Sequence, residues 1–221
     1  MIKKLGLTII GVLFLISLAS ADIFISQQPN EVYNLGDEMA IVLGSDGANG
    51  WATVNLVCSN ETKMIYYHYM TNKDTSVDIN LPLTKDSLRS MAGVCHLTTI
   101  FNGIEKQGVT FKISNEIYTT LTLNEKDVKP NSTLTFQGTA SKPNGATVTG
   151  SAEISVKDVG INIVVPIENN AFAGEIILPD TIGSREYTVE VFAYEKDEFN
   201  EQTNFGRYST SFKVIQEPRE I

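Results

Sequence analysis

The side chains best suited to chemistry are few, and their spacing does not favour a metal site. Cys58 and Cys95 are the only cysteines of the 221-residue chain, and His68 and His96 are its only histidines. His96 directly follows Cys95 on a predicted strand, so their side chains point to opposite faces. One tetrahedral zinc site cannot easily use both. We therefore expect no zinc ion and no cofactor.

The two cysteines are better suited to a disulfide. Cys58 shares a strand face with Val54 and Leu56, and Cys95 shares one with Leu97. Both sulfur atoms are therefore expected to point into a core. A bond between them would stabilise the fold by about 3–4 kcal/mol on the chain-entropy estimate.

Residue patterns typical of enzymes are missing from the sequence. No serine lies in a nucleophile elbow, no glycine-rich phosphate loop is found, and neither histidine belongs to a His-Glu-x-x-His helix. No pair of carboxylates is placed convincingly in one cleft. The sequence therefore predicts that the protein is not an enzyme. The least favoured alternative is an envelope-associated enzyme, or a non-catalytic portion of one.

An acidic loop near the C-terminus is a weak candidate for calcium. Its carboxylates are Glu195, Asp197, Glu198 and Glu201, and clustered oxygen ligands in a loop suit Ca²⁺. The loop lacks the regular Asp/Asn alternation of a dedicated site. The alternative is a solvated hairpin tip.

Residues 64–70 place large side chains on both faces of one predicted strand. A strand with one buried face should alternate, but this one contains Tyr66, Tyr67 and Tyr69 in close succession. One face is then an exposed aromatic strip, suited to stacking on sugar rings or docking a partner. The other interpretation is that the neighbouring domain or residues 82–92 cover both faces.

Two triplets match the N-glycosylation acceptor pattern. They begin at Asn60 and Asn131, and both fall in predicted turns. Whether they are used depends on the host.

The first 21 residues read as a secretory signal peptide. Lys3 and Lys4 precede an apolar run, and Ala19-Ser20-Ala21 supplies small residues for cleavage. Cleavage would remove two lysines and no acid, taking the net charge from −9 to −11. A charge of this sign disfavours nucleic acid. We expect a secreted or extracellular cell-surface protein with no membrane span after cleavage, whose partners are other cell-envelope proteins or glycans.

The remaining chain repeats one plan. Leu81-Pro82 and Leu178-Pro179 lie roughly 100 residues apart, as do Phe111-Lys112 and Phe212-Lys213, and a domain-sized period indicates tandem copies of one fold. Each copy contains seven short strand candidates with turn signals between them, which predicts a two-sheet sandwich. Only residues 84–91 could form a helical turn, with Thr84 as its cap. The predicted order is a signal peptide at 1–21, a sandwich at 22–114, a short linker at 115–118, a sandwich at 119–216 and a tail at 217–221.

Both copies resemble immunoglobulin-like sandwich domains of prokaryotic cell-surface proteins. Tyr187-Thr188-Val189 resembles the tyrosine corner of that fold, and Gly93-Val94-Cys95 holds the same place in the first copy without the ring. Cys95 thus falls where the second cysteine of an immunoglobulin domain would. Cys58 departs from the family, because it follows Trp51 and lies on the third strand, so its bond is expected to join neighbouring strands.

The second copy is also similar to macroglobulin-type and fibronectin-III-like modules, on residues 134–138 and 212–214. These motifs specify a fold and not an activity. The resemblance implies an all-β, non-catalytic surface protein that acts as a structural spacer or interaction module. The alternative is a carbohydrate- or protein-binding adhesin that uses residues 64–70.

Overall fold

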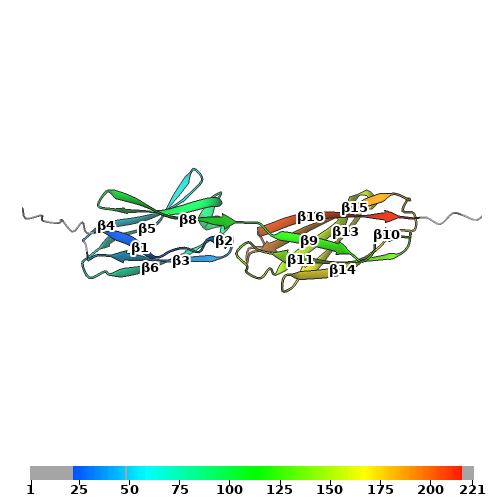
Figure 1. Ribbon diagram of the computed structural model, residues 1–221, viewed down its shortest axis with the longest axis horizontal. Coiled ribbons are helices and arrows are strands. Elements are labelled where there is room, and N and C mark those ends of the chain that lie inside the picture. Colours follow the sequence, from blue (N-terminus) through cyan, green and yellow to red (C-terminus); the bar gives the residue numbers. More distant parts are fainter. Residues whose placement is uncertain (1–21, 48, 216–221) are drawn as a thin grey trace, which may run out of the picture.

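The computed structural model describes residues 22–47 and 49–215 (Figure 1). The predicted signal peptide and the predicted tail lie outside these residues, so both stay predictions. The described chain is almost entirely β-structure, as predicted. No helix within the described ranges is long and apolar enough to cross a membrane.

The first sandwich contains strands β1 to β8. One sheet has the order β1-β3-β6 and the other the order β2-β8-β7-β4-β5. The bounds are β1 Ile23–Gln27, β2 Val32–Asn34, β3 Glu38–Ser45, β4 Gly50–Cys58, β5 Glu61–Met70, β6 Ser76–Pro82, β7 Gly93–Phe101 and β8 Ile104–Ser114.

The second sandwich, β9 to β16, repeats this topology strand for strand. Its sheets have the orders β14-β11-β9 and β10-β16-β15-β12-β13. The bounds are β9 Tyr118–Leu123, β10 Asp127–Val128, β11 Thr133–Ser141, β12 Gly150–Val156, β13 Ile161–Ile167, β14 Ala171–Ile177, β15 Glu186–Lys196 and β16 Gln202–Val214.

Each sandwich contains one strand more than the seven predicted. The additional strands are β2 and β10, and each pairs in parallel with the last strand of its own sandwich, β8 or β16. They are three and two residues long, too short to show an alternating pattern. Their equal places in both copies agree with the predicted tandem repeat.

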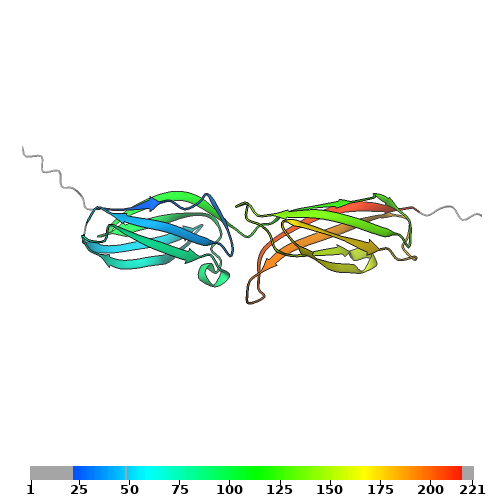
Figure 2. The same ribbon diagram turned by 90° about the horizontal axis from the view of Figure 1, so that it is seen from below.

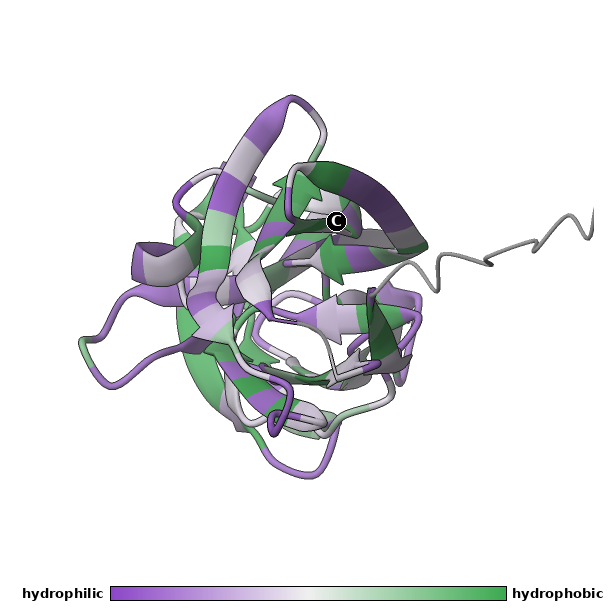
Figure 3. Ribbon diagram, turned by 90° about the vertical axis from the view of Figure 1, so that its left-hand side faces the viewer, coloured by the Kyte–Doolittle hydropathy of each residue, from purple (hydrophilic) through white to green (hydrophobic). Residues whose placement is uncertain are grey.

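Two separate hydrophobic cores fill the sandwiches. In β11 the inward residues Leu134, Phe136 and Ala140 are buried, and the residues between them are exposed apart from buried Gly138. This alternation follows from the two-residue period of a strand. Seen along the long axis, apolar and polar residues alternate in the same way along many strands (Figure 3).

The predicted helical turn is α1, Lys85–Leu88. Thr84 caps it, because its hydroxyl accepts a hydrogen bond from Ser87 N while Ser87 Oγ accepts one from Thr84 N. Leu88 is buried and anchors the turn to the first core. A 3₁₀ turn, η1 (Lys157–Val159), connects β12 to β13 in the second sandwich.

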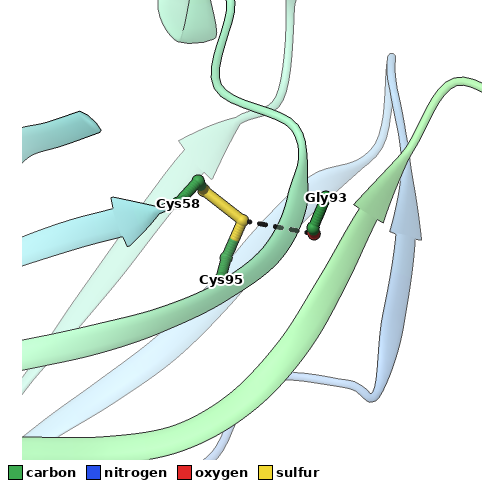
Figure 4. Close-up of a disulfide and its surroundings, with 3 residues drawn as sticks. All are labelled: Cys58, Gly93 and Cys95. Atoms are coloured by element: carbon green, nitrogen blue, oxygen red, sulfur yellow. Dashed lines mark hydrogen bonds between the residues drawn. A yellow bond between two sulfur atoms is a disulfide. The ribbon is translucent and has the colours of Figure 1, made fainter. Parts of the chain in front are cut away.

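The predicted disulfide is present (Figure 4). Cys58 and Cys95 are direct partners on β4 and β7, so the bond joins neighbouring strands of one sheet, as the departure from the immunoglobulin pattern predicts. The second sandwich has Val156 and Val189, both fully buried, at the equivalent ends of β12 and β15. One copy is thus cross-linked where the other packs two valines.

The tyrosine corner is also confirmed. The Tyr187 hydroxyl donates a hydrogen bond of 3.1 Å to Gly183 O, four residues upstream. The Tyr187 ring is buried and stacks on Phe212 at 5.6 Å. The motif therefore ties β15 to the loop before it, as in the fold it resembles.

The two sandwiches lie end to end, so the molecule is elongated (Figure 1). The described chain begins at one end of the long axis and finishes at the other. Across the junction, α1 and the β15–β16 hairpin approach each other (Figure 2). Residues 84–86, 197–199 and 201 line a cavity of about 320 Å³ between them.

Candidate interaction surface

Three aromatic side chains gather on the outer face of the first sandwich, and we call them the aromatic patch: Trp51, Tyr67 and Tyr69. Trp51 is the second residue of β4 and the direct partner of Tyr69 on β5. Its ring stacks on Tyr67 with centroids 4.8 Å apart and an interplanar angle of 5°, and it meets Tyr69 edge-on at 5.3 Å. About half of each residue stays in solvent, with exposed fractions of 51%, 56% and 44%.

The alternation of β4 explains this placement. Ala52 and Val54 point into the core and are fully buried, so Trp51 and Thr53 must point outward. Thr53 is the partner of Tyr67, which brings the tyrosine to the same face. The patch therefore follows from the register of the β4–β5 hairpin.

Tyr66 does not belong to this patch. It is the partner of buried Val54 and packs against the first core. Burial raises the pKa of the Tyr66 hydroxyl, and the negative charge of Asp74 raises it further. Of the three predicted tyrosines, the structure brings Tyr67 and Tyr69 together and places Tyr66 on the opposite side of the strand.

The predicted strip omitted Trp51, and local sequence patterns do not place it there. Residues 51–58 alternate, and the two strands connect through the short turn at Asn60. A hairpin register drawn from that turn alone would place Trp51 opposite His68, and the bulge at Val54 and Asn55 shifts its partner to Tyr69.

β5 is an edge strand, and little covers its aromatic half. α1 and the turn after it contact only the beginning of β5, where Lys63 Nζ donates to Ser87 O and Glu61 accepts a hydrogen bond from Ser90. A bulge opposite Val54 and Asn55 interrupts the pairing. Bulges twist an edge away from unwanted strand pairing.

A buried polar network connects the two sandwiches at the junction. Asn34 at the end of β2 is fully buried, and its side-chain nitrogen donates to Asn204 Oδ1 at 3.3 Å and to Glu116 O at 3.2 Å. Asn204 on β16 is 1% exposed and donates to Leu35 O at 2.8 Å and to Glu195 Oε2 at 2.9 Å. The bond to Glu195 stays within the second sandwich. The other three connect the first sandwich to the second sandwich or to the linker.

The linker is hydrogen-bonded along its length. Ile117 N donates to Phe205 O at 2.8 Å, and Phe205 N donates to Asn115 O at 2.8 Å. Lys112 donates to the Glu116 carboxylate at 2.8 Å, and this bond holds the pKa of that carboxyl below its usual value. The linker therefore pairs with β16 at the end of the second sandwich that faces the first.

The carboxylates of the acidic loop make contacts in two different places. Glu195 lies in the junction, where both of its oxygens are 3.1 Å from Lys142 Nζ. Asp197 closes the hairpin by accepting bonds from Phe199 N and Glu201 N. No group of three or more metal-binding side chains is found among residues 22–47 and 49–215. The Ca²⁺ candidates Glu195, Asp197, Glu198 and Glu201 thus divide between the junction and the hairpin tip.

The two glycosylation candidates lie in exposed turns. Asn60 lies in the β4–β5 turn, at the opposite end of the hairpin from Trp51, and Asn131 adopts a positive φ of 56° in the turn before β11. A glycan on either residue would leave the aromatic patch accessible. Their use stays a prediction.

No family model matches the chain, and no curated protein matches it. Among solved structures it is similar to a Corynebacterium diphtheriae protein described as membrane-anchored, with 12% identity, a TM-score of 0.44, and coverage of 90% of this chain and 56% of that one. It is also similar to the native alpha-2-macroglobulin of E. coli, with 12% identity, a TM-score of 0.36, and coverage of 88% and 16%. A third is Salmonella alpha-2-macroglobulin reacted with methylamine, with 11% identity, a TM-score of 0.33, and coverage of 88% and 15%.

This chain therefore spans little more than half of the first structure and about one sixth of the macroglobulins.

Proposed function

We propose that the protein is an extracellular, non-catalytic spacer and interaction module. Its two sandwiches would act as one stiff unit that holds the aromatic patch at the end remote from the second sandwich. The signal-peptide pattern of residues 1–21 supports export, and the absence of an enzyme-like residue pattern from the sequence supports the non-catalytic role.

The observation that carries this proposal is the junction. A flexible tether would leave Asn34 and Asn204 in water, but here both are buried and bonded across the linker. Buried polar groups are costly unless their partners are fixed. Relative motion of the sandwiches would break these bonds, so the native arrangement favours one orientation.

Pulsed electron resonance between two spin labels tests the stiffness. Labels at Glu105→Cys and Glu175→Cys sit on exposed positions of β8 and β14, and the native disulfide leaves no free cysteine in the described chain to compete. We expect a narrow distance distribution. A matched control carries a six-residue Gly/Ser insertion between Glu116 and Ile117, which should broaden it. A native distribution as broad as that of the insertion variant would contradict the proposal.

Adhesion through the same end of the molecule is the second candidate function. The exposure of Trp51, Tyr67 and Tyr69 favours it, because large apolar side chains grouped on a surface commonly mark binding sites.

A further inference from the structure

Resting on the proposed interaction role, we propose that the aromatic patch binds a neutral polysaccharide. The patch stands on the exposed face of the sheet near the beginning of the described chain, since the loop that leads to Trp51 contacts Asp22 through the bond from Asp46 N to Asp22 O. This places it at the end of the molecule far from the junction.

The strand segments around the patch carry no formal charge. β4, β7 and residues 64–70 of β5 contain no Asp, Glu, Lys or Arg, although such residues make up 19% of the chain. These three strands are neighbours in one sheet. On a protein of net charge −9, an uncharged face gives no electrostatic attraction to a charged partner.

The second sandwich shows that the fold does not require this arrangement. Its equivalent strands carry charges, including Glu153 on β12 and Glu190 on β15. One of its outer aromatic residues, Phe192, is covered by Arg207, whose guanidinium carbon lies 4.1 Å from the ring centroid. The second sandwich therefore does not repeat the uncharged strands that hold the aromatic patch in the first.

The chemistry of the patch suits a sugar chain. The faces of aromatic rings carry partial negative charge, and the C–H bonds on the less polar face of a sugar ring offer partial positive charge. Thr53 and Asn55 beside the rings, together with the tyrosine hydroxyls, supply hydrogen-bonding groups for sugar hydroxyls. A stable protein interface instead buries about 800 Å² per partner around a water-excluded centre. Three rings bordered by polar groups match a sugar chain better.

Trp51 makes the proposal directly measurable, because it is the only tryptophan of the chain. Its fluorescence should shift to shorter wavelength when a bound sugar displaces water. The protein, expressed from its full sequence, is titrated with a neutral glucan, a neutral mannan and an oligomer of β-1,4-linked N-acetylglucosamine. An anionic polyuronate is the charged comparison. We expect a saturable shift with at least one neutral polymer and none with the polyuronate.

Three variants separate stacking from other effects. Tyr67→Ala should weaken binding about tenfold by removing one ring of the stack, whereas Tyr67→Phe, which keeps the ring, should bind nearly as the native protein does. The matched control is Tyr208→Ala, since Tyr208 is 43% exposed but lies in the second sandwich. It should leave binding unchanged.

Two outcomes would overturn the inference. One is no shift with any neutral polymer, even if the protein captures an envelope protein through Tyr67. The other is a titration midpoint that Tyr67→Ala leaves unchanged. The spin-label distances on the same protein keep the two proposals apart: a stiff molecule without sugar binding overturns only this inference, and a flexible molecule that binds sugar overturns only the spacer.

Discussion

Asn204 shows how much one side chain contributes to the junction. It is 1% exposed, and its side-chain nitrogen donates hydrogen bonds to the backbone of the first sandwich and to a carboxylate of the second. Truncation would leave Leu35 O and Asn34 Nδ2 each short of one partner in a buried place.

We therefore expect Asn204→Ala to lower the free energy of unfolding by about 1–3 kcal/mol. Urea denaturation monitored by circular dichroism measures this. The matched control is Asn162→Ala, because Asn162 is exposed and its side chain bonds only Glu153 among the hydrogen bonds described. Its effect should be within about 0.5 kcal/mol. Equal effects of the two substitutions would contradict the role given to Asn204.

At this scale the sequence predicted some residues and missed others for physical reasons. Cys58 and Cys95 were predictable because strand alternation fixes their direction, and Tyr187 because its motif resembles the tyrosine corner. Asn34 and Asn204 were not, since a polar side chain is buried only when a distant segment supplies its partner. Asn34 and Asn204 are 170 positions apart, and no local pattern reports such a contact.

Among the elements, the pair β4 and β7 offers an internal experiment. The disulfide of the first sandwich occupies the place of Val156 and Val189 in the second. A double substitution, Cys58→Val with Cys95→Val, would convert the first copy to the arrangement of the second. The two valines keep this part of the core apolar, but the unfolded chain loses the restraint of the disulfide.

We expect this variant to lose about 3–4 kcal/mol of stability, on the chain-entropy estimate. Because each sandwich has its own core, differential scanning calorimetry should show a lower transition for the first sandwich and an unchanged one for the second. A shift of both transitions by equal amounts would mean that the sandwiches unfold together. No shift at all would contradict the stabilising role of the bond.

Most strands were predictable from alternation and turn residues, and the errors have a common cause. β16 begins at Gln202. Its first residues include buried Asn204 and Thr203, whose polarity is typical of a loop in the sequence. The strands β2 and β10 were not predicted, because their pairing is parallel and long-range.

For the whole molecule, a glycine sets how closely the linker can approach β16. A Cβ atom on Gly206 would lie 1.8 Å from Ile117 O, the carbonyl of the linker. Backbone cannot yield as a flexible side chain can. A short linker limits the relative motion of the two sandwiches, but this close approach and the bonds around it were beyond local sequence patterns.

We expect Gly206→Ala to displace the linker and broaden the distance distribution between the labels at positions 105 and 175. The matched control is Gly183→Ala. Gly183 also has no positive φ, but the atom nearest to an added Cβ would be the Tyr187 hydroxyl at 3.6 Å, an ordinary contact. A Gly206→Ala protein with the native distribution would show that the linker pairing does not set the orientation.

The parallel strands β2 and β10 also determine how the molecule would respond to tension. Each lies near the start of its sandwich and pairs with the strand that leaves it, through bonds such as Lys112 N to Glu31 O and Lys213 N to Lys126 O. A pull along the long axis would slide the paired strands past each other and load their hydrogen bonds together. Opening an antiparallel hairpin from its end breaks the bonds one at a time. Stretching should therefore meet its main resistance at these two short strands, one in each sandwich.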